Sequence, residues 1–284
     1  MMSQPNLEQL IASLAAEISQ VPGVSAVVLG GSRARGTQTE KSDIDLGIYY
    51  HPERPLDLAA LGRVAAQFDD ARRADALTPL GGWGPWINGG GWLTVQGIAV
   101  DFIYRDLAKV TKIIDDCQSG RVEIFYQPGH PHGFVSSIYM AELAVCKLLW
   151  ESDLGEVSAL KAQTDPYPAS LAQAIINSFA WEINFSLGIA RKAVSRGDVV
   201  YACGCCFRAA MCLLQVLFAL NGEYWLNEKG AVLVTEKFSL CPQNFRNRIE
   251  LAFATLSPQA LDIEQAIDLL DELSAEVGLI LEKA

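Results

Sequence analysis

The pattern of apolar and polar residues predicts alternating helices and strands over the first half of the chain. Apolar residues recur at helical spacing from residue 7 to residue 18, and Pro22-Gly23 then ends the predicted helix. The run V-S-A-V-V-L at 24–29 predicts a strand, and apolar and polar residues alternate over 43–48 with the period of a second strand. Residues 56–68 again have helical spacing.

A hairpin and a capped helix are predicted further along. The β-rich runs 93–95 and 98–104 are separated by Gln96-Gly97, which is typical of a tight turn. Asp106 is a suitable N-cap for a helix that runs to about residue 117. The segment G-G-W-G-P-W-I-N-G-G-G-W precedes the hairpin, and its three tryptophans are expected to pack on the sheet and the hairpin. Stacking of these tryptophans on a base or a sugar ring is the alternative.

From about residue 132 the apolar residues fall at helical periods almost to the end of the chain. The candidate helices cover 133–151, 169–196, 198–220, 242–255 and 258–282. We therefore predict two domains, residues 1–131 with mixed helices and strands and residues 132–284 as an all-helical bundle.

Composition and charge limit the classes of function. The 284 residues are 50% hydrophobic and 19% charged, as in globular proteins, and the net charge is −11. A protein that holds a long nucleic acid needs a basic face, so we expect no such partner. We see neither an uninterrupted apolar run of membrane-spanning length nor the pattern of a signal peptide at the N-terminus. We expect a cytoplasmic protein with no membrane partner and with seven reduced cysteines.

One cluster of polar residues carries the candidate chemistry. It consists of G-G-S-R-A-R-G at 30–36, followed by S-D-I-D-L at 42–46. In a strand, Asp43 and Asp45 project from one face, where their charges repel each other unless a cation lies between them. Carboxylates together with substrate phosphates are the ligands that Mg²⁺ prefers. Asp101, an acid within an apolar strand, is the best candidate for a third ligand.

The glycines before these acids suit an anion. Without Cβ atoms, Gly30 and Gly31 let the backbone approach phosphate oxygens closely. Ser32 adds a hydroxyl donor at a predicted helix start, and Arg33 and Arg35 add positive charge. The pattern therefore indicates a metal site that holds a nucleoside triphosphate.

These motifs resemble those of the polymerase β-like nucleotidyltransferase superfamily. Ten residues separate Ser32 from Asp43, the D-x-D lies between apolar residues, and a distant aspartate follows in a strand. The helical second half looks like that of the small antibiotic nucleotidyltransferases, such as the kanamycin and lincosamide enzymes. The resemblance implies an α+β fold, in which a small mixed sheet with flanking helices precedes a helical bundle.

The resemblance also implies a reaction and a set of roles. Members transfer a nucleoside monophosphate from a nucleoside triphosphate to a hydroxyl and release pyrophosphate. By analogy, Asp43 and Asp45 would bind two Mg²⁺ ions, and Asp101 would bind the catalytic one and could be the general base, with Glu123 as the alternative base. The triphosphate would contact six residues: Gly30, Gly31, Ser32, Arg35, Ser42 and Lys229.

The acceptor stays open at this stage. A small molecule, with an aminoglycoside-like compound as one candidate, is our main expectation. Modification of a partner protein, as in antitoxin-like members, and a non-catalytic nucleotide-binding module are the alternatives. The sequence does not specify the nucleotide or the oligomeric state. His130 and His132 are interpreted as part of a loop rather than as a metal pair, because their spacing does not place both rings on one helix face.

Overall fold

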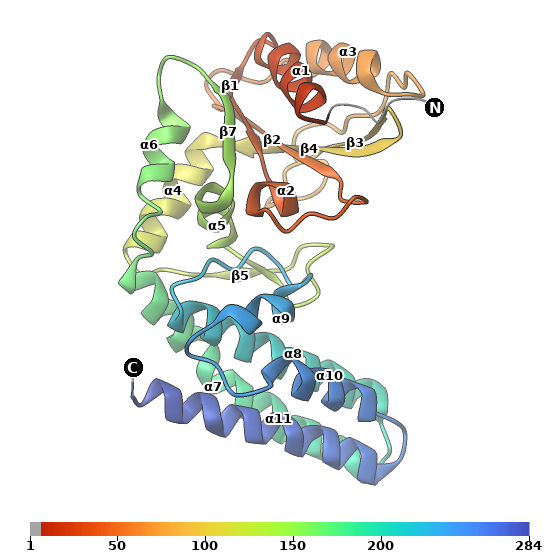
Figure 1. Ribbon diagram of the computed structural model, residues 1–284, viewed down its shortest axis with the longest axis vertical. Helices are drawn as coiled ribbons and strands as arrows, with labels where there is room; N and C mark the ends of the chain where they lie inside the picture. The colour runs from red at the N-terminus through yellow and green to blue at the C-terminus, as the bar shows by residue number, and fades with distance from the viewer. Residues whose placement is uncertain (1–6, 284) are drawn as a thin grey trace. The chain divides into compact units, whose positions relative to one another are not determined.

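The computed structural model describes residues 7–283, which form two compact units (Figure 1). One unit contains Met1–Asp115 and Tyr139–Pro166, and the other contains Asp116–Ile138 and Tyr167–Ala284. Residues 1–6, on which part of the signal-peptide interpretation rests, lie outside the described residues. The predicted division at 131/132 uses a single boundary, whereas the chain crosses between these units three times.

The first unit is built on a mixed five-stranded sheet. Strands β2 and β4 are parallel, and the other neighbours are antiparallel. The order across the sheet is β3-β4-β2-β1-β7. The strands are β1 Val24–Leu29, β2 Ile44–Tyr50, β3 Gly90–Val95, β4 Ile98–Asp106 and β7 Lys147–Glu151. This sheet confirms the predicted fold class.

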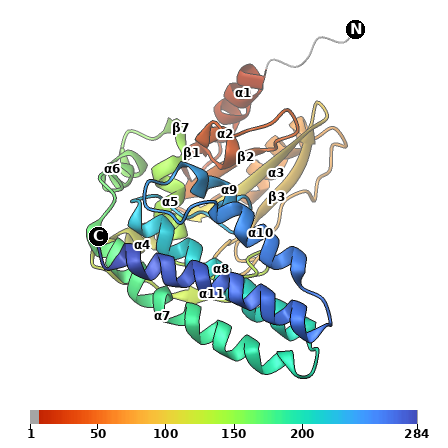
Figure 2. The ribbon, with the colours of Figure 1, turned by 60° about the horizontal axis from the view of Figure 1, so that its bottom comes forward.

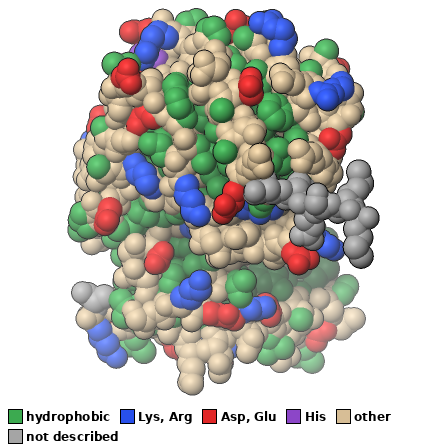
Figure 3. All heavy atoms as spheres, turned by 45° about the horizontal axis from the view of Figure 1, so that its top comes forward, with side chains coloured by type: hydrophobic (Ala, Val, Ile, Leu, Met, Phe, Trp, Pro, Cys, Tyr) green, Lys and Arg blue, Asp and Glu red, His purple; other side chains and the backbone are tan. Residues whose placement is uncertain are grey.

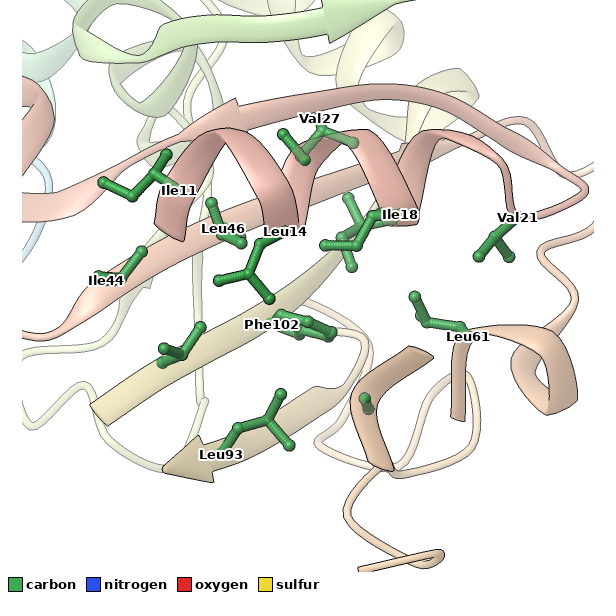
Figure 4. Close-up of a cluster of buried hydrophobic side chains, with 14 of the residues drawn as sticks. Ile11, Leu14, Ile18, Val21, Val27, Ile44, Leu46, Leu61, Leu93 and Phe102 are labelled. Carbon is green, nitrogen blue, oxygen red and sulfur yellow. The ribbon is translucent and has the colours of Figure 1, made fainter. Parts of the chain in front are cut away.

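One face of the sheet packs against helices α1 (Leu7–Ser19) and α3 (Leu58–Phe68) (Figure 4). Leu14 of α1 meets apolar side chains of the strands, among them Leu46 and Phe102, all fully buried. Because side chains alternate along a strand, this packing sends the residues between these positions to the opposite face. The D-x-D alternation thus places Asp45 away from the apolar core.

The predicted hairpin and caps are confirmed. Strands β3 and β4 pair in register across Gln96-Gly97, and both turn residues have positive φ. The two turn N–H groups donate to the carboxylate of Asp70, each at 2.9 Å. Asp106 accepts a hydrogen bond from the Lys109 N–H at the start of α4 (Leu107–Gln118), as its predicted capping role requires.

The predicted helix over 133–151 is confirmed only in its central part. This segment forms β6 (Phe134–Val135), α5 (Ile138–Val145) and the edge strand β7, which pairs with β1. Short apolar runs fit a strand as well as a helix, and β7 covers an edge of β1 that would otherwise expose unpaired backbone groups. A bidentate ion pair between Arg105 of β4 and Glu142 holds α5 to the sheet, with N···O distances of 2.7 and 2.6 Å.

The second unit is mainly helical. Three long helices, α7, α8 and α11, lie side by side (Figure 2). The unit contains the hairpin of β5 (Ile124–Phe125) with β6, the helices α7 Ala169–Val194, α8 Val199–Leu220, α9 Ala231–Val234, α10 Phe245–Thr255 and α11 Ala260–Leu281, and the short 3-10 helix η1 Thr235–Lys237. Helix α6 (Glu156–Ala162), which the sequence pattern did not predict, belongs to the first unit.

Helix α8 is long and apolar enough to cross a membrane by length and composition alone. However, 67% of its apolar window is buried inside the protein, and it packs against α7 and α11. This is the pattern of a helix in a protein core, so the composition of α8 is weak evidence for a membrane span.

Charged side chains are interspersed on the face shown in Figure 3. Lysines and arginines alternate there with aspartates and glutamates, and neither sign forms a continuous patch.

Candidate active site

Three carboxylates meet on the sheet face opposite the α1–α3 core. Asp45 of β2 is paired in parallel register with Asp101 of β4, so their side chains leave the sheet side by side on the same face. Asp43 lies just before β2. One oxygen from each of the three carboxylates lies within 4.8 Å of the others, and all three residues are partly buried. Hard oxygen donors this close together are suited to a divalent cation.

The glycine turn between β1 and the short helix α2 (Gly31–Arg35) lies directly against Asp45. The Gly30 N–H donates to the Asp45 carbonyl oxygen at 2.8 Å. Gly31 has φ +59°, and a Cβ atom there would lie 1.8 Å from Asp45 Oδ2. Only glycine therefore lets this backbone approach the carboxylate so closely.

Arg33 fixes the loop that carries the first aspartate. Its Nε donates to the carbonyl oxygen of Asp43 at 2.7 Å, and its Nη2 donates to the carbonyl of Ser42. The Ser42 hydroxyl in turn accepts from the Thr39 N–H at 2.9 Å. Arg33 thus binds the protein's own backbone, whereas the sequence suggested that it supplies charge to a triphosphate. Arg35, on the same helix, is half-buried.

The comparisons with known proteins identify this part of the chain. Residues 11–117 match the family model described as a nucleotidyltransferase domain. Over these residues, which make up most of the first unit, the chain is therefore similar to nucleotidyltransferase domains. This confirms the resemblance drawn from the glycine turn and the aspartates, and it supports nucleotidyl transfer as the general activity.

The other comparisons add less. Residues 139–229 match a family described as a domain of unknown function, DUF4037. A nucleotidyltransferase-like protein from Exiguobacterium sibiricum is similar in structure, with a TM-score of 0.45 and 13% identity, over 97% of this chain and 78% of that chain. The search of the curated proteins finds no match.

The three tryptophans of the nucleotidyltransferase domain have different environments. Trp86 is buried, as predicted, and the Lys109 ammonium lies 3.8 Å from its ring centroid. Trp83 stacks on Trp92, with ring centroids 4.4 Å apart. Trp92 itself is 62% exposed, so the prediction that it packs on the sheet is wrong. Its register partner on β4 is Asp101.

Two further predicted site residues lie in the other unit. Glu123 precedes β5 and is exposed, and its N–H donates to the Ser136 hydroxyl at 3.1 Å. Lys229 is exposed, and its N–H donates to the side-chain oxygen of Asn227 at 3.0 Å. The N-cap of the following helix, α9, is Gly230. The roles of Glu123 and Lys229 in catalysis stay predictions.

His132 belongs to a buried network that the sequence pattern did not reveal. Arg208 of α8 donates to its Nδ1 at 3.0 Å and to its carbonyl oxygen at 2.7 Å, and Glu182 of α7 pairs with the same guanidinium. The His132 N–H donates to Glu228 at 2.7 Å. Burial, aided by the Arg208 charge, lowers the pKa of His132 to about 3. At neutral pH the ring is therefore uncharged, and its contacts with Arg208 hold the loop in place.

Proposed function

We propose that the protein transfers a nucleoside monophosphate from a nucleoside triphosphate to a hydroxyl group of a small molecule, with Mg²⁺, and releases pyrophosphate. The observation that carries this proposal is the meeting of Asp43, Asp45 and Asp101 beside a glycine turn, within a nucleotidyltransferase domain.

The three carboxylates would hold the Mg²⁺ ions. Their donor set fits, because the three oxygens lie within 4.8 Å and are partly shielded from water. Bound Mg²⁺ supplies neutralisation of the charge that develops on the phosphoryl oxygens. The three carboxylates would fix the position of the cations. Arg33 would keep Asp43 in place through the backbone of its loop.

The turn beside the carboxylates would hold the phosphates. Gly30 and Gly31 keep the backbone next to Asp45, and the first N–H groups of a helix have no partners within that helix. We propose that the N–H groups at the start of α2, with the Ser32 hydroxyl, bind the β- and γ-phosphates. Arg35 would add positive charge, and Ser42 would support the same site through its loop.

The acceptor hydroxyl must lose a proton in the reaction. We propose that the Asp101 carboxylate accepts it, with Glu123 as the alternative base. A carboxylate oxygen of the base would take the proton from the acceptor hydroxyl. At the same time the new O–P bond would form and the bond between the phosphorus and pyrophosphate would break. A small acceptor is consistent with the net charge of −11, which disfavours a polyanionic acceptor.

The direct test is the substitution Asp45→Asn. Transfer from each of four α-labelled nucleoside triphosphates would be followed on a panel of hydroxyl compounds, together with pyrophosphate release. We expect Asp45→Asn to lower the rate by at least about a hundredfold, since it removes a charge that would stabilise the transition state. Asp153→Asn, which removes the same charge at an exposed position of the same unit, is the matched control and should keep the wild-type rate.

Two results would count against the proposal. One is an Asp45→Asn protein that folds and still transfers the label at the wild-type rate. The other is a wild-type protein that binds the triphosphate with Mg²⁺ but transfers no label to any small hydroxyl compound.

A further inference from the structure

The exposed indole of Trp92 lies beside Asp101, one of the three carboxylates. Strand β3 is at the edge of the sheet, and its residue Trp92 is directly opposite Asp101 of β4. Residues that face each other in antiparallel strands project from the same side, with Cβ atoms about 5 Å apart. Trp92 is therefore on the sheet face that carries Asp45 and Asp101, away from the apolar core.

The indole is held firmly although it is exposed. Trp83 stacks on one side of it at 4.4 Å, with an angle of 22° between the ring planes. Gly90 makes room for Trp83, because a Cβ atom at Gly90 would lie 2.9 Å from the Trp83 ring. Arg73 donates to the Trp92 carbonyl at 2.8 Å and is itself paired with the buried Asp69. With 62% of Trp92 exposed and one ring side stacked on Trp83, the other side is accessible.

Toward the turn between β3 and β4, the strand surface next to this ring carries two small side chains. Thr94, two residues along β3 from Trp92, is on the same face and is exposed. Its partner Ala99 on β4 is also exposed and is two residues from Asp101. A flat molecule can therefore lie over Thr94 and Ala99, against the indole, with an edge at the carboxylates.

The order of the strands indicates which of the two substrates, the triphosphate or the acceptor, would bind at this surface. The glycine turn follows β1, Asp45 is on β2, Asp101 is on β4 and Trp92 is on β3, so the turn and the indole lie on opposite sides of the carboxylates. In nucleotidyl transfer the attacking and leaving oxygens are roughly in line on opposite sides of the phosphorus. If pyrophosphate leaves toward the glycine turn, the acceptor arrives from the side of β3.

We propose that Trp92, supported by Trp83, is the platform on which the acceptor stacks, and that the acceptor is a hydroxylated ring compound such as a sugar. This inference rests on the proposed function and specifies its acceptor side. The apolar C–H face of the ring packs on the indole, and a ring hydroxyl reaches the carboxylates. An amino group on the ring adds a cation–π contribution.

The experiment compares ring acceptors with open-chain acceptors of the same polarity. Label transfer from the preferred α-labelled triphosphate is measured on glucose, glucosamine and larger amino sugars, with sorbitol as the open-chain counterpart. We expect transfer to ring compounds and little to sorbitol. Trp92→Ala should raise the acceptor KM by about tenfold or more, and Trp92→Phe should recover most of that loss because it keeps an aromatic face.

Two controls separate the platform from the nucleotide site. Binding of a non-hydrolysable triphosphate with Mg²⁺, measured by calorimetry, should be the same in Trp92→Ala and wild type. Trp181→Ala removes a tryptophan of nearly the same exposure, 61%, from α7 in the other unit, and its acceptor KM should not change.

Several outcomes would overturn the inference. Weaker binding of the triphosphate analogue by Trp92→Ala, with an unchanged acceptor KM, would assign the indole to the nucleobase. Equal transfer to sorbitol and to the ring compounds, or transfer to none of the rings, would refute the acceptor class. If Asp45→Asn abolishes transfer while Trp92→Ala has no effect, only the platform fails. If Asp45→Asn keeps full transfer, the proposed function itself fails.

Discussion

Gly31→Ala is the substitution whose effect the structure defines most closely. The new Cβ atom would lie 1.8 Å from Asp45 Oδ2 and 2.7 Å from the carboxyl carbon Cγ. Contacts of real Cβ atoms are almost never shorter than 3.0 Å, so the oxygen or the turn must move by about 1.2 Å. The substitution therefore displaces either the second carboxylate or the turn proposed to hold the phosphates.

Two free-energy effects follow, and they can be separated. Alanine at φ +59° costs roughly 1–2 kcal/mol of stability, because the left-handed conformation crowds its Cβ. A displacement of about 1 Å at a reacting centre costs on the order of a hundredfold in rate. We therefore expect a modest loss of stability together with a large loss of transfer and of divalent-cation affinity.

Gly36→Ala is the matched control. Gly36 ends α2 with φ +72°, so alanine there meets the same backbone penalty, but no atom lies within 4 Å of its added Cβ. Calorimetric titration with Mn²⁺ and urea unfolding would be done on both variants and on wild type. Gly36→Ala should lose stability but keep its cation affinity, whereas Gly31→Ala should lose both. Wild-type Mn²⁺ affinity in Gly31→Ala would refute the reasoning, since the collision could then not disturb Asp45.

Three further predictions concern other parts of the structure. Arg33→Ala should weaken Mn²⁺ binding about tenfold because Asp43 loses its backbone support, and Arg33→Lys should recover part of it in the same titration. The pKa of His132 is lowered in the folded state, so unfolded chains take up protons below about pH 6.5; urea unfolding should show stability falling from there toward pH 3, and less steeply in His132→Asn. Arg105→Met should cost about 3 kcal/mol in urea unfolding by leaving Glu142 unpaired, and adding Glu142→Leu should restore part of that loss.

The fold was predictable where local pattern decides the structure. The two-residue alternation around Asp43 and Asp45 was enough to bring the two carboxylates together, although Asp43 lies just before β2. Gln96-Gly97 was enough for the hairpin, because its positive φ values need residues that tolerate them. The segment 133–151 could not be assigned in this way, because pairing with the edge of β1 turns Lys147–Glu151 into a strand.

The candidate site was predictable in its residue types but not in its supports. The acidic ligands could be chosen from the sequence because charged residues are rare within apolar strands. The link from Arg33 to the backbone of Asp43 has no sequence signature, since an arginine near a glycine turn fits a phosphate ligand equally well. The exposure of Trp92 was equally hidden, because tryptophans in a glycine-rich segment before a hairpin are typical of packing.

The sequence by itself determined the glycine turn, the D-x-D strand and the helical character of most of the second half, since each depends on residues close together in the chain. The tertiary structure decided what depends on strands distant in sequence. The parallel register of β2 and β4 puts Asp45 beside Asp101. Gly31 approaches Asp45 so closely that residue 31 has no space for a side chain. The pairing of β3 with β4 brings an exposed indole to the same carboxylates. Local periodicity specifies which face a side chain takes, but only packing of the whole sheet specifies its neighbour on that face.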